Sequence, residues 1–247
     1  MINIVIPMAG SGSRFAKAGF TKAKPFIDVA GKPMIVRVME NLKYPDAQFF
    51  LIGQERHLTE ENKTINEIKD NFNAHFIFID KLTEGTVCTI LHARKYINNN
   101  TPLLIANSDQ IIENGIAGFI NDCFQRSLDG SILTFNDESL NPKWSFAKTD
   151  DNGLVTEVQE KKPISDLATA GIYLFRKGND FVDGAIDMII NNDRVNNEFY
   201  TCPVYNYAIK NGLQIGTYSI NHTWMHGLGT PEDLEKYLKD GISEKLI

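Results

Sequence analysis

The sequence predicts an α/β fold with a mostly parallel mixed sheet. In the first half of the 247 residues, short runs rich in branched aliphatic and aromatic residues alternate with segments whose apolar residues recur at helical spacing. Beyond Gly130 the strand-like runs follow one another more closely, and Asn152-Gly153 between two of them is typical of a tight β-hairpin. Parallel βαβ units followed by antiparallel strands form a mixed sheet.

The composition limits the classes of protein to which the chain can belong. Hydrophobic residues make up 43% of the chain and charged residues 23%, which favours a folded core without disulfides. With 25 Lys and Arg against 31 Asp and Glu, no basic surface for nucleic acid is expected. The apolar runs fall short of the roughly 20 residues that a membrane span needs. The N-terminus enters a strand-like run without a basic leader. We therefore expect a cytoplasmic protein with neither a nucleic-acid nor a membrane partner.

The first half contains the predicted parallel sheet. Val87, Ile90, Leu91 and Tyr96 lie near helical spacing, and the other helices are predicted on the same ground. A loop rich in Gly, Ser and Lys separates the first strand from the first helix. The predicted strands are 2–8, 48–53, 75–79 and 102–106, and the predicted helices are 33–42, 62–73, 85–97 and 115–126.

The second half continues the same domain, because no linker divides the chain. Its last helix is predicted to begin at Thr230-Pro231, with Pro at the first helical position and acids at Glu232 and Asp233 in the first turn. The predicted strands are 131–135, 146–149, 154–159, 167–175 and 214–220, and the other predicted helices are 180–191 and 200–211. We expect one α/β domain with an inserted substrate-binding portion.

A glycine-rich loop, Ala9-Gly10-Ser11-Gly12, directly follows the first strand. Backbone amides in such a loop can face a phosphate without obstruction by side chains. Phe15 occupies the third glycine position of a GxGxxG dinucleotide pattern, and the GKS or GKT of a Walker A motif is absent. By itself the loop is equally a flexible turn, which leaves Arg14 and the lysines downstream unexplained.

The loop and the residues after it carry a resemblance to a known family. The stretch ending in Arg14-Phe15, followed ten residues after Arg14 by Lys24-Pro25 and then by Gly31-Lys32-Pro33, resembles the signature of the nucleotidyltransferases that activate sugar phosphates. The resemblance implies a Rossmann-like mixed sheet of the nucleotidyltransferase type. It implies a single domain, 1–247, with a nucleotide-binding half at 1–128 and an acceptor-binding half at 129–247.

The same resemblance implies a nucleotide site. Arg14 and Lys24 would neutralise the triphosphate and act in catalysis, whereas Lys32-Pro33 would serve the fold. Lys17 and Lys22 either belong to the site or are solvated lysines on the surface, and the sequence leaves both interpretations open. The implied triphosphate cradle is Ala9, Gly10, Ser11, Gly12, Arg14 and Lys24.

Glu84-Gly85-Thr86 resembles the base-contacting turn of the family, although Val87 stands where Ala is usual and the preceding Gln is missing. We expect all three residues to bind the nucleotide. CTP is favoured over UTP and dTTP by a resemblance to capsular cytidylyltransferases. As a separate inference, Glu84 can accept a hydrogen bond from a cytosine amino group. The alternative is that Glu84 is a solvated acid at a helix start.

Asp109 is the predicted metal ligand and the third catalytic residue. Asn107-Ser108-Asp109 follows the predicted strand 102–106, and open α/β sheets bind ligands at the C-terminal ends of their strands. The resemblance, in which Gly-Asp is usual at this point, implies that Asp109 holds Mg²⁺ together with triphosphate oxygens and water.

Segments of the second half resemble the acceptor site of the family. Glu160 would contact the body of the acceptor, Lys161 its phosphate, and Gly171 would allow close approach. Lys162 is an alternative to Lys161, and the other interpretation of the pair is a charged strand end in solvent. Glu198 lies in a further acceptor element that resembles Gly-Glu-Tyr.

His226 stands close to where the family commonly has a second metal-binding Asp before Gly229-Thr230. Imidazole suits Mg²⁺ less well than carboxylate does. We therefore expect His226 to bind the acceptor or a phosphate, or to be structural.

The resemblance implies single-displacement nucleotidyl transfer from a nucleoside triphosphate to a phosphorylated sugar or other small molecule. The opening Ile6-Pro7-Met8 and the ending around Gly227-Leu228 are similar to capsule and surface-polysaccharide members, some of them cytidylyltransferases of capsular phosphoramidate synthesis. One alternative is a glycosyltransferase, but Asn107 replaces the first Asp of its DxD motif. Another is a non-catalytic nucleotide sensor. The sequence leaves open whether the chain is a homo-oligomer.

Overall fold

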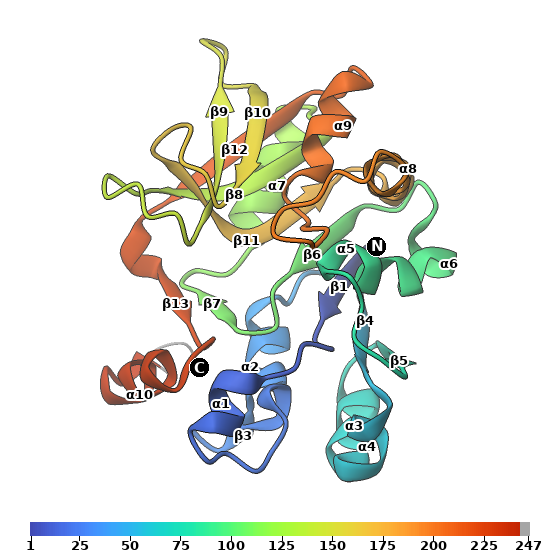
Figure 1. Ribbon diagram of the computed structural model, residues 1–247, viewed down its shortest axis with the longest axis vertical. Helices are drawn as coiled ribbons and strands as arrows, with labels where there is room; N and C mark the ends of the chain where they lie inside the picture. The colour runs from blue at the N-terminus through green and yellow to red at the C-terminus, as the bar shows by residue number, and fades with distance from the viewer. Residues whose placement is uncertain (243–247) are drawn as a thin grey trace.

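A nine-stranded mixed sheet runs through the computed structural model, which describes residues 1–242 (Figure 1). Its parallel part has the strand order β6-β1-β4-β5. The bounds are Ile2–Pro7 for β1, Ala47–Gln54 for β4, Ala74–Ile79 for β5 and Leu103–Ala106 for β6. These strands match the four predicted in the first half, and the α/β fold with a mostly parallel mixed sheet is confirmed.

The long strand β11, Leu167–Phe175, joins the two parts of the sheet. It runs antiparallel to β6 and, on its other edge, to β8, which spans Gly130–Asn136. The predicted hairpin is formed by β9, Ser145–Thr149, and β10, Val155–Glu160. β12, Ile215–Ile220, lies parallel to β8, so the second half is itself mixed rather than wholly antiparallel.

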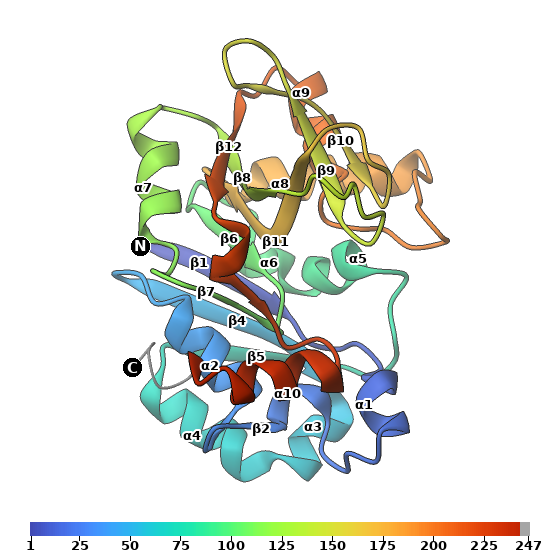
Figure 2. The same cartoon turned by 90° about the vertical axis from the view of Figure 1, so that its left-hand side faces the viewer.

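Helices cover both faces of the sheet, as Figure 2 shows. Ile4 and Val5 of β1 belong to two separate hydrophobic clusters, because successive side chains of a strand point to opposite faces. The helices that contribute to the Ile4 cluster are α1 (Ser13–Lys17), α2 (Met34–Asn41), α4 (Asn62–Asn71), α7 (Ala117–Gln125) and α10 (Pro231–Lys239). Those of the Val5 cluster are α5 (Thr86–Ile90), α6 (Arg94–Ile97), α8 (Gly178–Ile190) and α9 (Val204–Lys210).

Two predicted helices differ from the structure. The helix predicted at 85–97 is broken into α5, a 3₁₀ turn at Leu91–Ala93 and α6. The part rich in β-branched residues, Thr86–Ile90, is itself helical, and the interruption falls after it at Leu91–Ala93. The helix predicted from residue 200 begins only at Val204. Pro203 precedes it, and a residue before proline is disfavoured in helical conformation.

Several short elements were not predicted. They are α1 (Ser13–Lys17), a 3₁₀ turn at Lys24–Phe26, β2 (Asp28–Val29), β3 (Lys32–Pro33), α3 (Glu55–Glu60), β7 (Gln110–Ile112), a 3₁₀ turn at His222–Trp224 and β13 (Met225–Gly227). Most have too few residues to display a period. Among residues 1–242, no helix is both long and apolar enough to span a membrane.

The C-terminal segment crosses back to the first half of the chain. β13 pairs with β7, and α10 lies beside that half in Figure 2. As predicted, Pro231 is the first residue of α10, and the Thr230 hydroxyl caps the helix by accepting a hydrogen bond from the Asp233 amide at 3.1 Å. The backbone amide of Leu228 donates to the carbonyl of Asp109 at 2.7 Å, which brings the C-terminal segment to the end of β6.

Candidate active site

A cavity of about 520 Å³ lies at the C-terminal ends of β1 and β6. Ligands of open α/β sheets bind at this edge, because the loops that leave parallel strands meet there. The cavity is lined by residues 7–15, Lys24, Pro25, Leu82, Thr83, Gly85, Thr86, Thr89, 107–109, Glu198, Tyr200 and Gly229. The structure thus brings the predicted triphosphate cradle, Asp109, Gly85, Thr86 and Glu198 together in one wall.

The glycine loop presents its backbone to this cavity. Within the described part of the chain, none of the six backbone amides from Ala9 to Arg14 donates a hydrogen bond to another protein atom. Gly12 has a φ of 62°, in the left-handed region that favours glycine. Six unpaired N–H groups beside a cavity form a neutral but strongly donating lining, which suits an oxyanion.

Lys24 and Asp109 form an ion pair inside the cavity, between Nζ and Oδ2. Lys24 starts a short 3₁₀ turn that is anchored by the buried side chains of Pro25 and Phe26. A Cβ on Gly229 would lie 2.9 Å from Oδ2 of Asp109, so glycine leaves room beside the carboxylate. Arg14 lines the same cavity with an exposed side chain, and no ion pair involves it within residues 1–242.

The turn at Gly85 is joined to the second half of the chain. The amide of Phe199 donates to the carbonyl of Glu84 at 2.8 Å, and the amide of Val87 donates to the carbonyl of Phe199 at 3.0 Å. A Cβ on Gly85, whose φ is 119°, would lie 2.5 Å from the backbone N and O of Phe199. The turn and the segment that carries Glu198 therefore form one backbone unit.

Glu84 does not take the position expected of a base-binding side chain. Its carboxylate pairs with Arg194 at 2.6 Å, the side chain is 67% exposed, and Glu84 is absent from the cavity wall within residues 1–242. Arg194 in turn stacks on the ring of Phe199 at 4.1 Å. In this arrangement the Glu84 side chain braces the turn from outside the cavity.

The predicted acceptor residues lie around Tyr200. Nζ of Lys161 donates to the Tyr200 hydroxyl at 2.6 Å, and that hydroxyl donates to Glu198, which lines the cavity with Tyr200. Glu160 accepts a hydrogen bond from the Ser145 hydroxyl. Burial raises the pKa of Glu160, although the bond from Ser145 opposes the shift. Lys161 and Glu160 therefore adjoin the cavity wall rather than form it.

The backbone conformation decides which of the two adjacent lysines, Lys161 or Lys162, faces Tyr200. Lys161 has a φ of 56°, and its amide donates to the carbonyl of Trp144 at 3.0 Å. Its side chain is half-buried against Tyr200, whereas Lys162 is exposed. Of the two lysines, Lys161 is the one that the fold directs to this cluster.

Gly171 lies behind the cavity. Its φ is 70°, and an added Cβ would lie 2.2 Å from Nδ2 of Asn107 and 2.4 Å from Oε1 of Gln110. Asn107 and Gln110, which flank Asp109, are themselves joined by a 3.0 Å hydrogen bond. Glycine at this position makes room for the loop that holds Asp109, a packing role that sequence reasoning missed.

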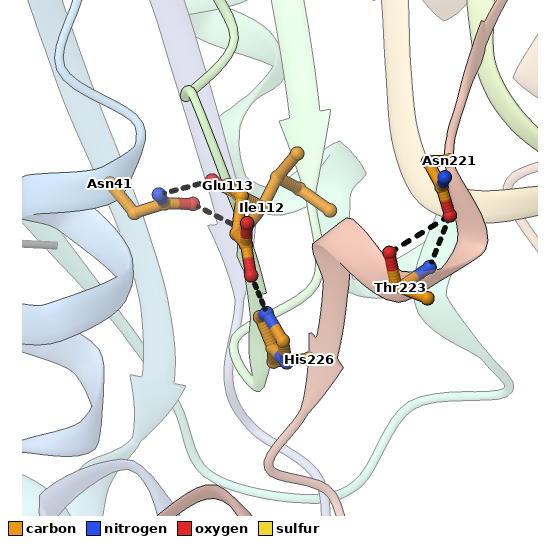
Figure 3. A network of polar contacts seen from close by, with 6 residues as sticks. All are labelled: Asn41, Ile112, Glu113, Asn221, Thr223 and His226. Atoms are coloured by element: carbon orange, nitrogen blue, oxygen red, sulfur yellow. Dashed lines mark hydrogen bonds and ion pairs between the residues drawn. The ribbon is translucent and has the colours of Figure 1, made fainter. Parts of the chain in front are cut away.

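His226 is held by Glu113, the residue directly after the neighbouring strand β7. Its Nε2 lies 2.8 Å from Oε1 of Glu113, and Figure 3 shows the ring directed at that carboxylate. Asn41 bonds to both the amide and the carbonyl of Ile112, at 2.9 and 2.8 Å, and fixes the strand beside it. Since His226 is not part of the cavity wall within residues 1–242, its structural interpretation is favoured over acceptor binding.

Sequence reasoning missed Tyr200 and Gln54. Tyr200 lies two residues after the recognised Glu198, so its place in the segment was the available signal. Gln54 ends β4, the strand beside β1, and its side chain bonds to the glycine loop. A polar residue at the C-terminal end of a strand next to β1 was a signal for it.

The chain is similar to known proteins in both sequence and fold. The family model described as nucleotidyl transferase matches residues 4–240. The bifunctional protein GlmU of Methanococcus aeolicus is 27% identical over 177 residues, which are 70% of this chain and 40% of that protein. The low-salt glycan biosynthesis nucleotidyltransferase Agl11 of Haloferax volcanii is 23% identical over 235 residues, which are 93% of this chain and 63% of that protein.

A solved structure agrees over nearly the whole chain. The nucleoside-diphosphate-sugar pyrophosphorylase of Vibrio cholerae RC9 superimposes with a TM-score of 0.82 at 25% identity, covering 96% of this chain and 99% of that one. By contrast, this chain spans 40% of the GlmU protein that it matches. Because the family match extends over residues 4–240 and the fold agrees from end to end, the chain belongs to the nucleotidyl transferase family.

Proposed function

We propose that this chain transfers a nucleotidyl group from a nucleoside triphosphate to a phosphorylated sugar or similar small molecule, with release of pyrophosphate. One observation carries the proposal: six consecutive unpaired amides share a cavity with Lys24 and Asp109. The amides and Lys24 suit the triphosphate, and the carboxylate suits a hard cation bound to it.

The reaction needs no covalent enzyme intermediate. An oxygen of the acceptor phosphate attacks the α-phosphorus, and the bond from that phosphorus to the pyrophosphate oxygen breaks. Lys24 and Arg14 stabilise the charge that develops on the phosphate oxygens, and the loop amides hold the triphosphate in line for attack. Positioning and charge neutralisation supply most of the catalysis in such transfers.

The donor set supports a Mg²⁺ ion that is shared with the substrate. Among residues 1–242 no three His, Cys, Asp or Glu side chains are gathered as a metal site. Asp109 has room beside its carboxylate at Gly229, and Mg²⁺ commonly binds through one or two carboxylates, phosphate oxygens and water. When bound, the ion would offset phosphate charge, and Asp109 would hold it.

The acceptor is proposed to enter from the side of Glu198 and Tyr200. Residues 1–128 would then bind the nucleotide and residues 129–247 the acceptor, within one domain. The Lys161 ammonium beside Tyr200 supports recognition of the acceptor phosphate, and Glu160 suits hydroxyl or amino groups. The names of Agl11 and of the Vibrio protein support a nucleotide-sugar product. The proposal extends to a cytoplasmic enzyme whose product is used in a capsule or other surface polysaccharide.

The proposal is tested by pyrophosphate release. The purified chain is assayed with CTP, UTP, dTTP, GTP and ATP against a panel of sugar 1-phosphates and other phosphorylated small molecules, with MgCl₂ or with EDTA. We expect release that depends on both an acceptor and the divalent ion. Release without any acceptor, or no release across the panel while a nucleoside triphosphate binds, would contradict the proposal.

We propose CTP as the nucleotide, but we do not attribute the preference for CTP to a contact between Glu84 and the base. The similarity to capsular members at Ile6-Pro7-Met8 supports the base, whereas Glu84 pairs with Arg194 outside the cavity. We expect wild type to have a higher kcat/KM for CTP than for UTP and dTTP. Glu84→Gln should leave that ratio unchanged. A wild type that prefers UTP or dTTP would contradict the CTP proposal. A change in the kcat/KM ratio in Glu84→Gln would show that Glu84 contributes to recognition of the base.

A further inference from the structure

Gln54 is bonded to the glycine loop from the neighbouring strand. Its Nε2 donates to the carbonyl of Ala9 at 2.8 Å and to the carbonyl of Gly10 at 3.1 Å. β4, which Gln54 ends, runs parallel to β1, with Ile52 opposite Pro7. A single side chain therefore engages two successive peptide groups at the start of the loop.

Because each peptide group is planar, these two hydrogen bonds also fix the direction of the loop N–H groups. In a planar trans peptide the C=O and the following N–H point in opposite directions. No cis peptide bond occurs in the described residues, so the carbonyl of Ala9 opposes the N–H of Gly10, and the carbonyl of Gly10 opposes the N–H of Ser11. With both carbonyls directed at Gln54, the two N–H groups point away from it. Gly10 and Ser11 both line the cavity.

We propose that Gln54 is a positioning residue, which turns the N–H groups of Gly10 and Ser11 toward a phosphate in the cavity. This inference rests on the proposed function for its ligand. Gln54 acts through the loop backbone, because within residues 1–242 it is not part of the cavity wall.

The amide of Gln54 is held in the orientation that this role requires. Its side chain belongs to the capping box at the start of α3, and Oε1 accepts a hydrogen bond from Nε of Arg56 at 2.7 Å. The backbone amide of Gln54 donates to Nδ1 of the buried His57 at 3.2 Å. With Oε1 engaged by the helix, Nε2 faces the loop.

The loop has room for the opposite orientation. Among the described residues, a Cβ on Gly10 would meet nothing within 4 Å, so the space beside its Cα is open, and glycine adopts φ of either sign without strain. A rotated peptide would present a carbonyl oxygen to the phosphate, which repels it. The two bonds from Gln54 therefore select the conformation that binds an anion.

The test compares two glutamines of β4. Gln54→Met keeps the length of the side chain and removes both donors, and Gln48→Met is the matched control at the other end of the strand, where the amide contacts His75 at 2.9 Å. Binding of inorganic tripolyphosphate and of CTP is measured by calorimetry, together with the KM of each substrate. Loss of two hydrogen bonds should weaken both ligands roughly tenfold or more. The KM of the acceptor should stay within about twofold, and Gln48→Met should match wild type.

A second readout does not depend on the ligand. In the ligand-free protein, the ¹H–¹⁵N nuclear Overhauser effects of Gly10 and Ser11 should fall in Gln54→Met and not in Gln48→Met. Gln54→Glu keeps an acceptor for the helix cap and loses the donors, so the same fall is expected with little change in melting temperature.

The outcomes separate the inference from the proposed function. If wild type binds neither tripolyphosphate nor CTP, the proposed function fails, while the relaxation data still test the loop. Unchanged relaxation of Gly10 and Ser11 in both Gln54 variants would overturn the positioning role. So would unchanged tripolyphosphate affinity in Gln54→Met when wild type binds.

Discussion

Lys24 and Asp109 form an ion pair across 85 positions of sequence, and each side chain is 22% exposed. Lys24 comes from the loop after β1 and Asp109 from the loop after β6, two neighbouring parallel strands. The pair balances charge in the ligand-free cavity. A triphosphate with its cation offers each residue a new partner of opposite charge, so we expect the pair to separate when the complex forms.

Asp109→Asn should lower turnover by at least about a hundredfold, because an amide supports a hard cation far less well than a carboxylate. Binding of CTP without the metal should persist, since the loop amides remain. Steady-state pyrophosphate release and calorimetry check the two expectations. Asp151→Asn, an exposed change in the hairpin turn, is the control. A fully active Asp109→Asn enzyme would remove Asp109 from the metal site.

Lys24→Ala should reduce kcat by roughly a hundredfold or more, because a cation at the reacting phosphate contributes mainly to the transition state. Stability should change by less than about 1 kcal/mol, as is usual for a partly exposed ion pair. Lys22→Ala, two positions earlier with an exposed side chain, serves as the matched control. Equal kcat/KM in Lys24→Ala and wild type would exclude Lys24 from the reaction.

Gly85→Ala should destabilise the protein more than Gly212→Ala does. Both glycines have positive φ, 119° and 82°, but a Cβ meets the backbone of Phe199 at 2.5 Å only at Gly85, and nothing within 4 Å at Gly212. Backbone strain costs about 1 to 3 kcal/mol in either variant, and the overlap adds to it at Gly85. Urea unfolding measures the difference. Equal losses in the two variants would mean that the contact between the turn and Phe199 is not rigid.

The stability of the protein should depend on pH through His57. Burial, together with the charge of Arg56, lowers the pKa of His57 to about 4, and the charge of Glu60 opposes the shift. Between pH 6.5 and about 4 the unfolded state therefore binds a proton that the folded state does not, so the free energy of unfolding falls as the pH falls through this window. The full effect is roughly 3 kcal/mol.

His57→Gln should flatten that dependence. Urea unfolding of wild type and variant is compared at pH 7.5, 6 and 5, and His75→Gln, at an exposed histidine, is the control. The gap in stability between wild type and His57→Gln should narrow or reverse toward pH 5. A constant gap across the three pH values would show that His57 titrates as it does in the unfolded chain.

The local features of this protein follow from its sequence alone. Periodicity places most strands and helices, Asn152-Gly153 marks the hairpin, and Thr230 caps the last helix. These features depend on residues a few positions apart, where turn chemistry and side-chain spacing act directly. The convergence of Arg14, Lys24 and Asp109 on one cavity was also predictable, because loops after neighbouring parallel strands meet at one edge of a sheet.

Long-range packing determined the partners of several polar side chains in and around the site. Glu84 turns outward because Arg194, far along the chain, provides a charge for it, and His226 turns to Glu113 because β13 pairs with β7. Gln54 reaches the glycine loop because β4 pairs with β1. A polar side chain takes whichever partner the fold places within hydrogen-bonding distance, and the identity of that partner is set by strand pairing between segments up to 113 residues apart. Local sequence patterns indicate where strands end, but they do not identify the partner that each side chain meets.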